Sequence, residues 1–318
     1  MRAVRQHRYG PAEVLALEEV PDPTPGPGEL LVRVSAAGVN YADALLRAHE
    51  PEPMSGYPAV LPVTPGVEVA GTVIAAGPDT DTTLVGTRVT SFLQSGGYAE
   101  LAVVPAATAV PIPVGLDDNR ALALYAQGAT AVGVVEAARL TAEDTVLVTA
   151  AAGGVGSLVV QLAKRTGATV VAAASSERKL DLARKLGADR VVDYSRPGWT
   201  EEIGPVTVVL DSVGGAIAAE AYRLLPARSG RMVIYGYASG GPAELTVTDV
   251  FQAGAALIPF SLMHGPRLLA DFCAQAWELA VAGELEPVIG DVLPLAEAAR
   301  AHRALEDRSS VGKLILTP

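Results

Sequence analysis

Val-Leu-Val-Thr-Ala-Ala-Ala-Gly-Gly-Val-Gly, residues 146–156, is the stretch that decides the fold. The β-branched and apolar residues of Thr145–Thr149 show no polar alternation, which predicts a buried strand. The small residues of Ala150–Gly156 then turn the chain directly into a helix. Its apolar positions recur at helical spacing, at Val155, Leu158, Val159 and Leu162. A strand, a glycine turn and a helix in this order are typical of a dinucleotide site, because glycines let the backbone approach a pyrophosphate. The alternative is a tight turn without a ligand, and the flanking pattern favours the cofactor.

Length, composition and charge restrict the class of protein. At 318 residues, half of them apolar, the chain is long enough for two domains with a large core. The net charge of −11 argues against nucleic acid and an anionic membrane as partners. The single cysteine, Cys273, excludes a disulfide framework, and the first residues lack the apolar segment of a signal peptide. Because Gly, Pro or a charge interrupts every apolar run, we expect no membrane span and a soluble, cytoplasmic protein.

The pattern of predicted elements changes along the chain. Residues 1–121 are rich in proline, glycine and short strand signals, which indicates a β-rich, barrel-like module. Strands and helices alternate over residues 122–259, which predicts an α/β fold with a doubly wound parallel sheet. In such a sheet the ligand crevice lies at the carboxyl ends of the strands. Because the opening module lacks helices to cover it, we expect residues 260–318 to return to it.

The end of the second strand of the alternating region indicates which nicotinamide cofactor fits. An NAD site usually has an acidic residue there, which binds the ribose 2′-hydroxyl. This strand ends in alanines followed by Ser175 and Ser176, with Arg178 and Lys179 in the next turn. Room, hydroxyl donors and positive charge suit a 2′-phosphate, which favours NADPH over NADH. The alternative is that Arg178 and Lys179 are solvated helix charges, and Glu177 is expected to point into solvent at the helix start.

Several motifs, in order along nearly the whole chain, connect it to a known family. They are Ala37–Asp43, Pro65–Gly71, Gly96–Glu100, Ala150–Gly156, Leu186–Asp189, Asp211–Gly215 and Gly312–Pro318. In these motifs the chain resembles the medium-chain dehydrogenase/reductase superfamily, specifically its zinc-free quinone oxidoreductases related to zeta-crystallin. The resemblance implies a GroES-like catalytic domain, residues 1–121 and 260–318, and a Rossmann NADPH-binding domain, residues 122–259. It also implies an active-site cleft between the two domains.

The residues at the expected ligand positions predict that no zinc is bound. Zinc-dependent relatives use a cysteine near residues 39–40 and a histidine just before Glu68, where this chain has Val39, Asn40 and Val67. Valine cannot donate to a metal, and one distant cysteine cannot build a four-thiolate structural site. The four histidines are scattered along the chain without ligand spacing.

The resemblance further implies where the cofactor and the substrate lie. Relatives place the segment of Asn40, Tyr41 and Asp43 beside the nicotinamide ring, so we expect these residues to position the cofactor and the substrate. Asp43 has a structural alternative, an ion pair with Arg47 one helical turn further on. The expected cofactor-binding residues are Thr130, Ala152, Gly153, Gly154, Val155, Ser175, Ser176, Arg178, Lys179, Tyr194, Gly236 and Arg308.

One departure from the family pattern bears on the substrate. Many relatives follow the arginine of this segment with a glycine and then a tyrosine that lines the substrate cleft. This chain has Ala48 and His49 after Arg47, so that tyrosine is missing. Tyr57 is a candidate to replace it, and its surroundings equally favour a turn.

These observations together predict an enzyme that transfers hydride from NADPH to a quinone or an α,β-unsaturated carbonyl without zinc. The alternatives are an enoyl-thioester reductase and a non-catalytic NADPH-binding protein. Relatives are mostly homodimers or homotetramers that often join at the edges of the Rossmann sheet. The apolar stretch Ala255–Leu262 is a candidate edge strand, so we expect a homodimer.

Overall fold

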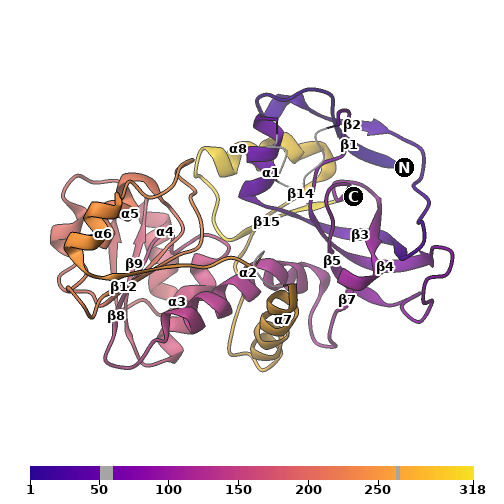
Figure 1. Cartoon of the computed structure of the whole chain (residues 1–318). Helices are drawn as coiled ribbons and strands as arrows, with labels where there is room; N and C mark the ends of the chain where they lie inside the picture. The colour runs from indigo at the N-terminus through magenta and orange to yellow at the C-terminus, as the bar shows by residue number, and fades with distance from the viewer. Residues whose placement is uncertain (51–59, 263–265) are drawn as a thin grey trace. The chain divides into compact units, whose positions relative to one another are not determined.

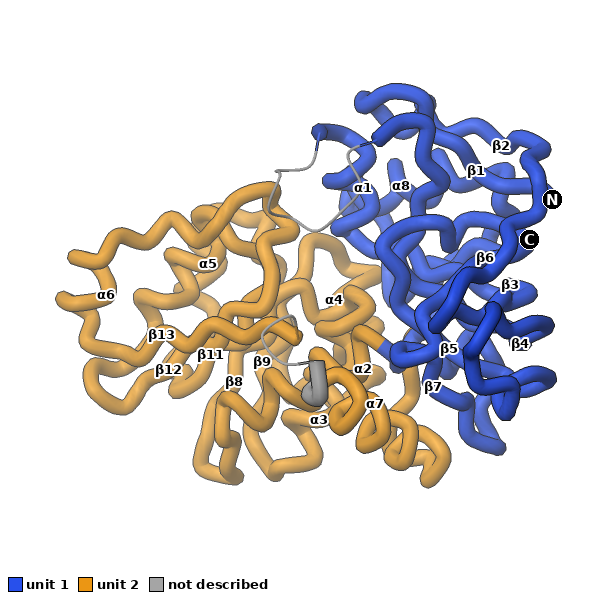
Figure 2. Tube along the Cα trace, turned by 45° about the vertical axis from the view of Figure 1, so that its right-hand side comes forward, with its two compact units in different colours: residues 1–125, 289–318 blue, residues 126–288 orange. Residues whose placement is uncertain are grey.

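The computed structural model describes residues 1–50, 60–262 and 266–318. The chain divides into two compact units, coloured separately in Figure 2. Unit 1 comprises residues 1–125 and 289–318, and unit 2 comprises residues 126–288. Each unit contains its own large sheet (Figure 1).

The sheet of unit 2 is parallel throughout and has the strand order β10-β9-β8-β11-β12-β13. Its strands are β8 (Thr145–Val148), β9 (Thr169–Ala174), β10 (Arg190–Asp193), β11 (Val208–Asp211), β12 (Arg231–Ile234) and β13 (Ala256–Pro259). The helices that alternate with them are α3 (Gly156–Arg165), α4 (Glu177–Lys185), α5 (Gly215–Tyr222), α6 (Val247–Ala253) and α7 (Pro266–Val281), with the short helix η3 (Trp199–Glu202). Numbered from β8, the strand order is 3-2-1-4-5-6, which is the doubly wound order with its reversal between β8 and β11.

The larger sheet of unit 1 has the order β14-β15-β3-β4-β5-β7, and β6 pairs with β3. Its strands are β3 (Glu29–Val39), β4 (Glu68–Ala76), β5 (Arg88–Phe92), β6 (Leu101–Pro105), β7 (Val110–Pro111), β14 (Ile289–Pro294) and β15 (Lys313–Thr317). A separate two-stranded sheet contains β1 (Arg2–Gln6) and β2 (Leu15–Glu19). The helical elements are η1 (Ala12–Val14), α1 (Tyr41–Ala48), η2 (Ala106–Thr108), η5 (Leu295–Glu297) and α8 (Ala298–Glu306). The antiparallel pairing of β15 with β3 brings the C-terminal strand beside the segment that leads into α1.

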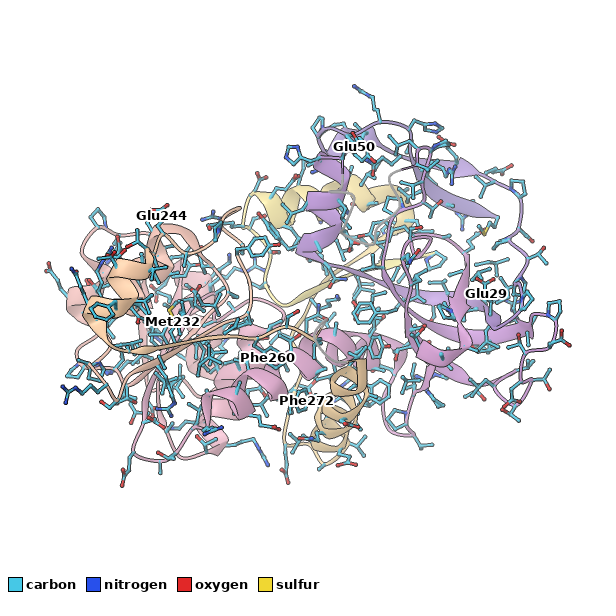
Figure 3. The ribbon with its side chains drawn as sticks, in the orientation of Figure 1. Glu29, Glu50, Met232, Glu244, Phe260 and Phe272 are labelled. Carbon is cyan, nitrogen blue, oxygen red and sulfur yellow. The ribbon has the colours of Figure 1, made fainter. Side chains whose placement is uncertain are left out.

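The division between the units differs from the one expected from the sequence. Residues 260–288 belong to unit 2, and only residues 289–318 return to unit 1. The reason is that α7 packs within unit 2: the rings of Phe260 and Phe272 lie at 41° to each other with centroids 6.4 Å apart (Figure 3). Gly133 leaves the space for this pair, because a Cβ atom there would lie 2.1 Å from Phe260.

Helix α2 (Asp118–Ala138) bears on the expectation that the chain has no membrane span. This helix has 21 residues and is long and apolar enough to cross a membrane by length and composition. However, 72% of its most apolar window is buried inside the protein, as in a core helix.

Candidate functional site

The reversal point of the unit 2 sheet is the first candidate site. There β8 and β11 are neighbours, with Leu147 opposite Val209, and the loops after them lead to α3 and α5. Doubly wound sheets bind ligands outside the carboxyl ends of the strands at such a reversal. The structure places the predicted cofactor-binding residues Ala152, Gly153, Gly154 and Val155 in the loop after β8, at this point.

The loop after β8 is a tight turn that depends on small residues. Ala150 has a left-handed backbone, with φ of 48°, and its carbonyl oxygen accepts the N–H of Gly153 at 2.9 Å. A Cβ atom on Gly156, the first residue of α3, would lie 2.2 Å from the carbonyl oxygen of Ala150. A larger residue at Gly156 would therefore move the backbone of the turn. The turn leads straight into the N-terminus of α3, and the positive end of the helix dipole suits a phosphate.

A buried hydrogen bond joins the ends of β8 and β11, and neither of its residues was among the predicted site residues. The hydroxyl of Thr149 donates to Asp211 at 2.6 Å and accepts the N–H of Ser212 at 3.2 Å. The other carboxylate oxygen of Asp211 accepts the N–H of Gly214 at 2.9 Å. Burial raises the pKa of Asp211, and its bonds to Thr149 and to backbone N–H groups oppose this rise. The carboxylate thus holds the two loops in register at the reversal point.

The end of β9 contains the residues expected to select the cofactor. Ser175 is half-buried, Ser176 and Arg178 are exposed, and Lys179 is half-buried, all at the start of α4. Glu177 is exposed, as expected, and its carboxylate accepts a hydrogen bond from Arg184 at 2.7 Å. The acidic group nearest to Arg178 and Lys179 in sequence is thus engaged further along the helix.

The other predicted cofactor-binding residues lie in several elements. Tyr194 follows β10, donates its N–H to Ala174 at 3.1 Å and packs edge-on against Trp199, so its ring has a packing role. Gly236 follows β12 at the same end of the sheet. Thr130 lies on α2, where its hydroxyl donates to the carbonyl of Ala126 at 2.8 Å. Arg308 follows α8 in unit 1 and has φ of 53°.

The second candidate site is a buried polar cluster in unit 1, at the start of α1. Lys313 donates from Nζ to Glu68 Oε2 at 2.6 Å and to Asn40 Oδ1 at 2.8 Å. Asn40 donates from Nδ2 to Glu68 Oε2 at 3.2 Å. Lys313 and Glu68 are 3% and 0% exposed. Of these three residues only Asn40 was predicted as a site residue. In the structure its side-chain amide contacts both members of the ion pair.

Asp43 occupies the next turn and caps α1. Its carboxylate accepts the backbone N–H of Asn40 at 2.8 Å and the hydroxyl of Tyr98 at 3.2 Å. Burial raises the pKa of Asp43 to about 6, and the N–H of Asn40 and the charge of Lys313 oppose this rise. Tyr41, the first residue of α1, is half-buried.

The structural alternative for Asp43, an ion pair with Arg47, is not formed between these two described residues. Arg47 is buried and instead donates to the carbonyl of Gly10 and to Glu306. Because Glu306 ends α8, the guanidinium joins α1 to α8 rather than completing an (i, i+4) pair within α1. Asp43 therefore remains available to hold the start of α1.

A histidine from α8 completes the cluster around Asp43. The single hydroxyl hydrogen of Tyr98 goes to Asp43, so His302, 3.1 Å away, donates its Nε2–H to the Tyr98 oxygen. His302 Nδ1 is then unprotonated, and it has no hydrogen-bond partner among the described residues. Burial, together with the charge of Arg47, lowers the pKa of His302 to about 3.

A cavity of about 40 Å³ in unit 1 lies against this cluster. Its walls include Asp43, Arg47, Val67 and Gln94. The volume is enough for a small number of water molecules rather than for a whole substrate. His49, at the position where relatives have a tyrosine, is exposed, and Tyr57 lies outside the described residues.

The residues of the cluster do not suit a zinc ion. Across residues 1–50, 60–262 and 266–318, no group of three or more His, Cys, Asp or Glu side chains could hold a metal. The buried ammonium of Lys313 lies 2.6 Å from Glu68 and takes the place that a cation would need beside that carboxylate.

Comparison with known proteins identifies both units. Residues 26–114 match the alcohol dehydrogenase GroES-like domain, and residues 154–280 match the zinc-binding dehydrogenase family. The chain is 32% identical to a 2-haloacrylate reductase of Burkholderia sp over 98% of its own length and 97% of that protein. It is 31% identical to the quinone oxidoreductase of Sus scrofa over 99% and 97% of the two chains. The structure of Escherichia coli quinone oxidoreductase complexed with NADPH is similar over both whole chains, with a TM-score of 0.91 and 27% identity.

Proposed function

Because the chain belongs to the medium-chain dehydrogenase/reductase superfamily, we propose that it is an NADPH-dependent reductase of quinones or α,β-unsaturated carbonyls that works without zinc. The main support is the full-length similarity to a quinone oxidoreductase and a 2-haloacrylate reductase. Each of these names describes reduction of an electron-poor, conjugated compound. A similar solved structure contains NADPH. Unit 2 is the proposed nucleotide-binding domain, and unit 1 supplies the proposed substrate-contacting groups.

The residues of unit 2 fit an NADPH molecule. The small residues of the turn from Ala150 to Gly156 would let a pyrophosphate approach the backbone, and the positive end of the α3 dipole would stabilise its charge. Ser175, Arg178 and Lys179 supply hydroxyl and cationic groups for a 2′-phosphate, and β9 ends without a carboxylate.

When bound, the nicotinamide would supply the hydride, and the protein would orient the acceptor and stabilise the charge that develops on its oxygen. We assign that second task to the side-chain amide of Asn40. Its Oδ1 accepts from Lys313, so its Nδ2 is the side of the amide that can donate to a substrate oxygen. Tyr41 and Asp43 shape the start of α1 around this amide.

The activity can be tested by following the absorbance of NADPH in the presence of three kinds of acceptor. We expect oxidation with 1,4-benzoquinone, 9,10-phenanthrenequinone or 2-chloroacrylate, and no loss of rate after dialysis against EDTA. Turnover of crotonyl-CoA alone would instead support an enoyl-thioester reductase. Tight NADPH binding without turnover of any acceptor would support a non-catalytic NADPH-binding protein.

We also propose that the protein is a cytoplasmic homodimer joined at the β13 edge of the unit 2 sheet. β13 ends the strand order, so one side of its backbone faces no strand of this sheet. Large apolar side chains are exposed nearby in sequence: Val247 and Phe251 on α6 are 88% and 86% exposed, and Leu257 on β13 is 38% exposed.

A double substitution tests this assembly. We expect Leu257→Lys with Phe251→Lys to convert a dimer into a monomer in sedimentation equilibrium, because a charge on the edge strand and a like charge on the neighbouring helix oppose pairing. Val114→Glu is the matched control, since Val114 is 96% exposed in unit 1 and should leave the mass unchanged. A wild-type protein that is already monomeric at high concentration would contradict the proposal.

A further inference from the structure

The amide of Asn40 lies against a buried ion pair that has no role in the function proposed so far. Lys313 comes from the C-terminal strand β15, Glu68 begins β4, and Asn40 immediately precedes α1. The pairing of Leu314 with Val39 in the β15–β3 register brings Lys313 beside Asn40, although the two residues are 273 positions apart. Three distant segments thus meet at one amide.

We propose that Lys313 is a positioning residue that fixes the orientation of the Asn40 amide. This role rests on the proposed function, because it matters for catalysis only if Asn40 contacts the substrate oxygen. In this role Lys313 acts through its bonds to Asn40 and Glu68.

The chemistry of the three side chains determines the orientation. An amide has one accepting end and one donating end, an ammonium only donates, and a carboxylate only accepts. In the observed arrangement Asn40 Oδ1 faces Lys313, and Nδ2 faces Glu68. A flipped Asn40 would set an N–H against the ammonium and an oxygen against the carboxylate, and both contacts would be repulsive. The ion pair therefore selects one of the two orientations.

Burial strengthens the preference for one orientation of the amide. Stabilisation of the fold alone does not explain why an ion pair is buried here. Lys313 and Glu68 are almost entirely buried, where charge–dipole interactions are stronger than in water. A buried ion pair often contributes little net stability, because two charges must first lose their hydration. The charges of Lys313 and Glu68 are needed, however, to fix the direction in which the Asn40 amide donates its hydrogen bond.

The backbone is also adapted to admit this pair. Gly38 lies on β3 beside the two charges, and a Cβ atom on it would be 2.4 Å from Glu68 Oε2 and 2.8 Å from Lys313 Cε. Because Gly38 does not have a positive φ, the reason for glycine here is space rather than backbone conformation. The strand thus leaves room for the ion pair at the base of the Asn40 amide.

The test removes the two charges together. Lys313→Met alone would leave the buried charge of Glu68 without its ammonium, and we expect that variant to be strongly destabilised. The neutralised variant, Lys313→Met with Glu68→Gln, avoids this problem and also offers Asn40 both an acceptor and a donor at residue 68. We would measure kcat, the KM for 1,4-benzoquinone, the NADPH dissociation constant and the urea midpoint for wild type, the neutralised variant, Asn40→Ala and their combination.

We expect the neutralised variant to lower kcat about tenfold while KM and the NADPH dissociation constant change less than about twofold, the loss typical of one misaligned hydrogen bond. Added to Asn40→Ala, the same changes should cause no further loss, because the residues act as a unit. Lys164→Met, which removes a lysine from an exposed ion pair of unit 2, should leave kcat unchanged. Losses that multiply in the combined variant, or a neutralised variant with wild-type kcat, would overturn the role of Lys313.

A second measurement needs no substrate and separates the failure of this inference from failure of the proposed function. In the protein without nucleotide, the side-chain N–H signals of Asn40 in ¹⁵N NMR should exchange with water at least about tenfold faster in the neutralised variant, since one hydrogen bond is worth about that factor. Unchanged exchange would refute the positioning by Lys313 even in an active enzyme. Faster exchange in a protein that reduces no acceptor, or with a fully active Asn40→Ala, would support the positioning and refute the proposed catalytic use of Asn40.

Discussion

Replacing Arg178 and Lys179 together by alanine should weaken NADPH binding about 100-fold and NADH binding less than about threefold. The factor corresponds to about 1.4 kcal/mol for each of two charge-assisted contacts to an exposed phosphate. Both residues lie in the first turn of α4, directly after Ser175 and Ser176 at the end of β9. NADH has a neutral 2′-hydroxyl at the same place, so loss of the two charges should affect it little. Fluorescence titration of the free protein with each nucleotide measures both constants.

A lysine at the other end of the same helix supplies the control. Lys185 is exposed in the last turn of α4, so Lys185→Ala removes one positive charge without touching the proposed phosphate site. It should leave the preference for NADPH unchanged. Comparable losses for NADPH and NADH in the double variant would show that Arg178 and Lys179 are solvated helix charges and that the 2′-phosphate is bound elsewhere.

The elements of unit 2 could be predicted more completely than those of unit 1, because each of them is recognisable from a short, continuous stretch of sequence. The alternation of strands and helices that was predicted for residues 122–259 is present in the structure, for example at β9 (Thr169–Ala174) and β10 (Arg190–Asp193). Strands buried on both faces appear as continuous apolar runs, and each is followed by a helix of recognisable period. The loops proposed to bind the cofactor follow these strands directly. Their position at one end of the sheet therefore follows from the alternation alone.

Unit 1 depends on contacts between distant segments. The strand β14 (Ile289–Pro294) was not predicted, and the short helix α1 (Tyr41–Ala48) was implied only by the alternative that Asp43 pairs with Arg47 one helical turn further on. α1 has only eight residues, and β14 takes its place by parallel pairing with β15. The helix or strand propensity of so few residues is a weak signal, and contacts with distant segments outweigh it.

The residues of the buried polar cluster in unit 1 were also hard to predict, because they come from distant segments of the chain. Asn40 was predicted from the resemblance, whereas Lys313, Tyr98 and His302 were not. Their positions in sequence are far apart, so no spacing rule could connect them. One local signal was present: Lys313 begins the apolar run Leu314–Leu316, and a charged residue on a buried strand needs a partner.

The two titratable groups on either side of Tyr98 should give opposite pH dependences of stability. His302 has a pKa of about 3 in the folded protein, below its ordinary value of 6.5, chiefly because it is buried. Between these two values the unfolded chain binds the extra proton, so acidification favours unfolding. Asp43 has a folded pKa of about 6, above its ordinary 3.8, also chiefly through burial. Between 3.8 and about 6 the folded protein binds the extra proton, so acidification favours folding.

In the wild type these two effects oppose each other, and substitution of either group should reveal the other. Relative to wild type, His302→Gln should gain about 3 kcal/mol in the free energy of unfolding from about pH 7 to about pH 4.5, since 1.36 kcal/mol corresponds to each pH unit. Asp43→Asn should lose about 2 kcal/mol relative to wild type over the same range, because the stabilising uptake of a proton is removed. Urea unfolding followed by circular dichroism measures all three proteins.

The signs of these two changes are a stricter test than their sizes. A protonated His302 would place a second N–H at Nδ1, where no described residue accepts it, and its charge would face Arg47. A protonated Asp43 still accepts from Tyr98 or the Asn40 N–H and loses only an unfavourable buried charge. If His302 were instead exposed to water when folded, His302→Gln would run parallel to wild type at every pH. The free energy of unfolding of His302→Gln could run parallel to that of wild type at every pH while Asp43→Asn shows its expected loss. That result would show that the cluster is open to water on the α8 side and closed only on the α1 side.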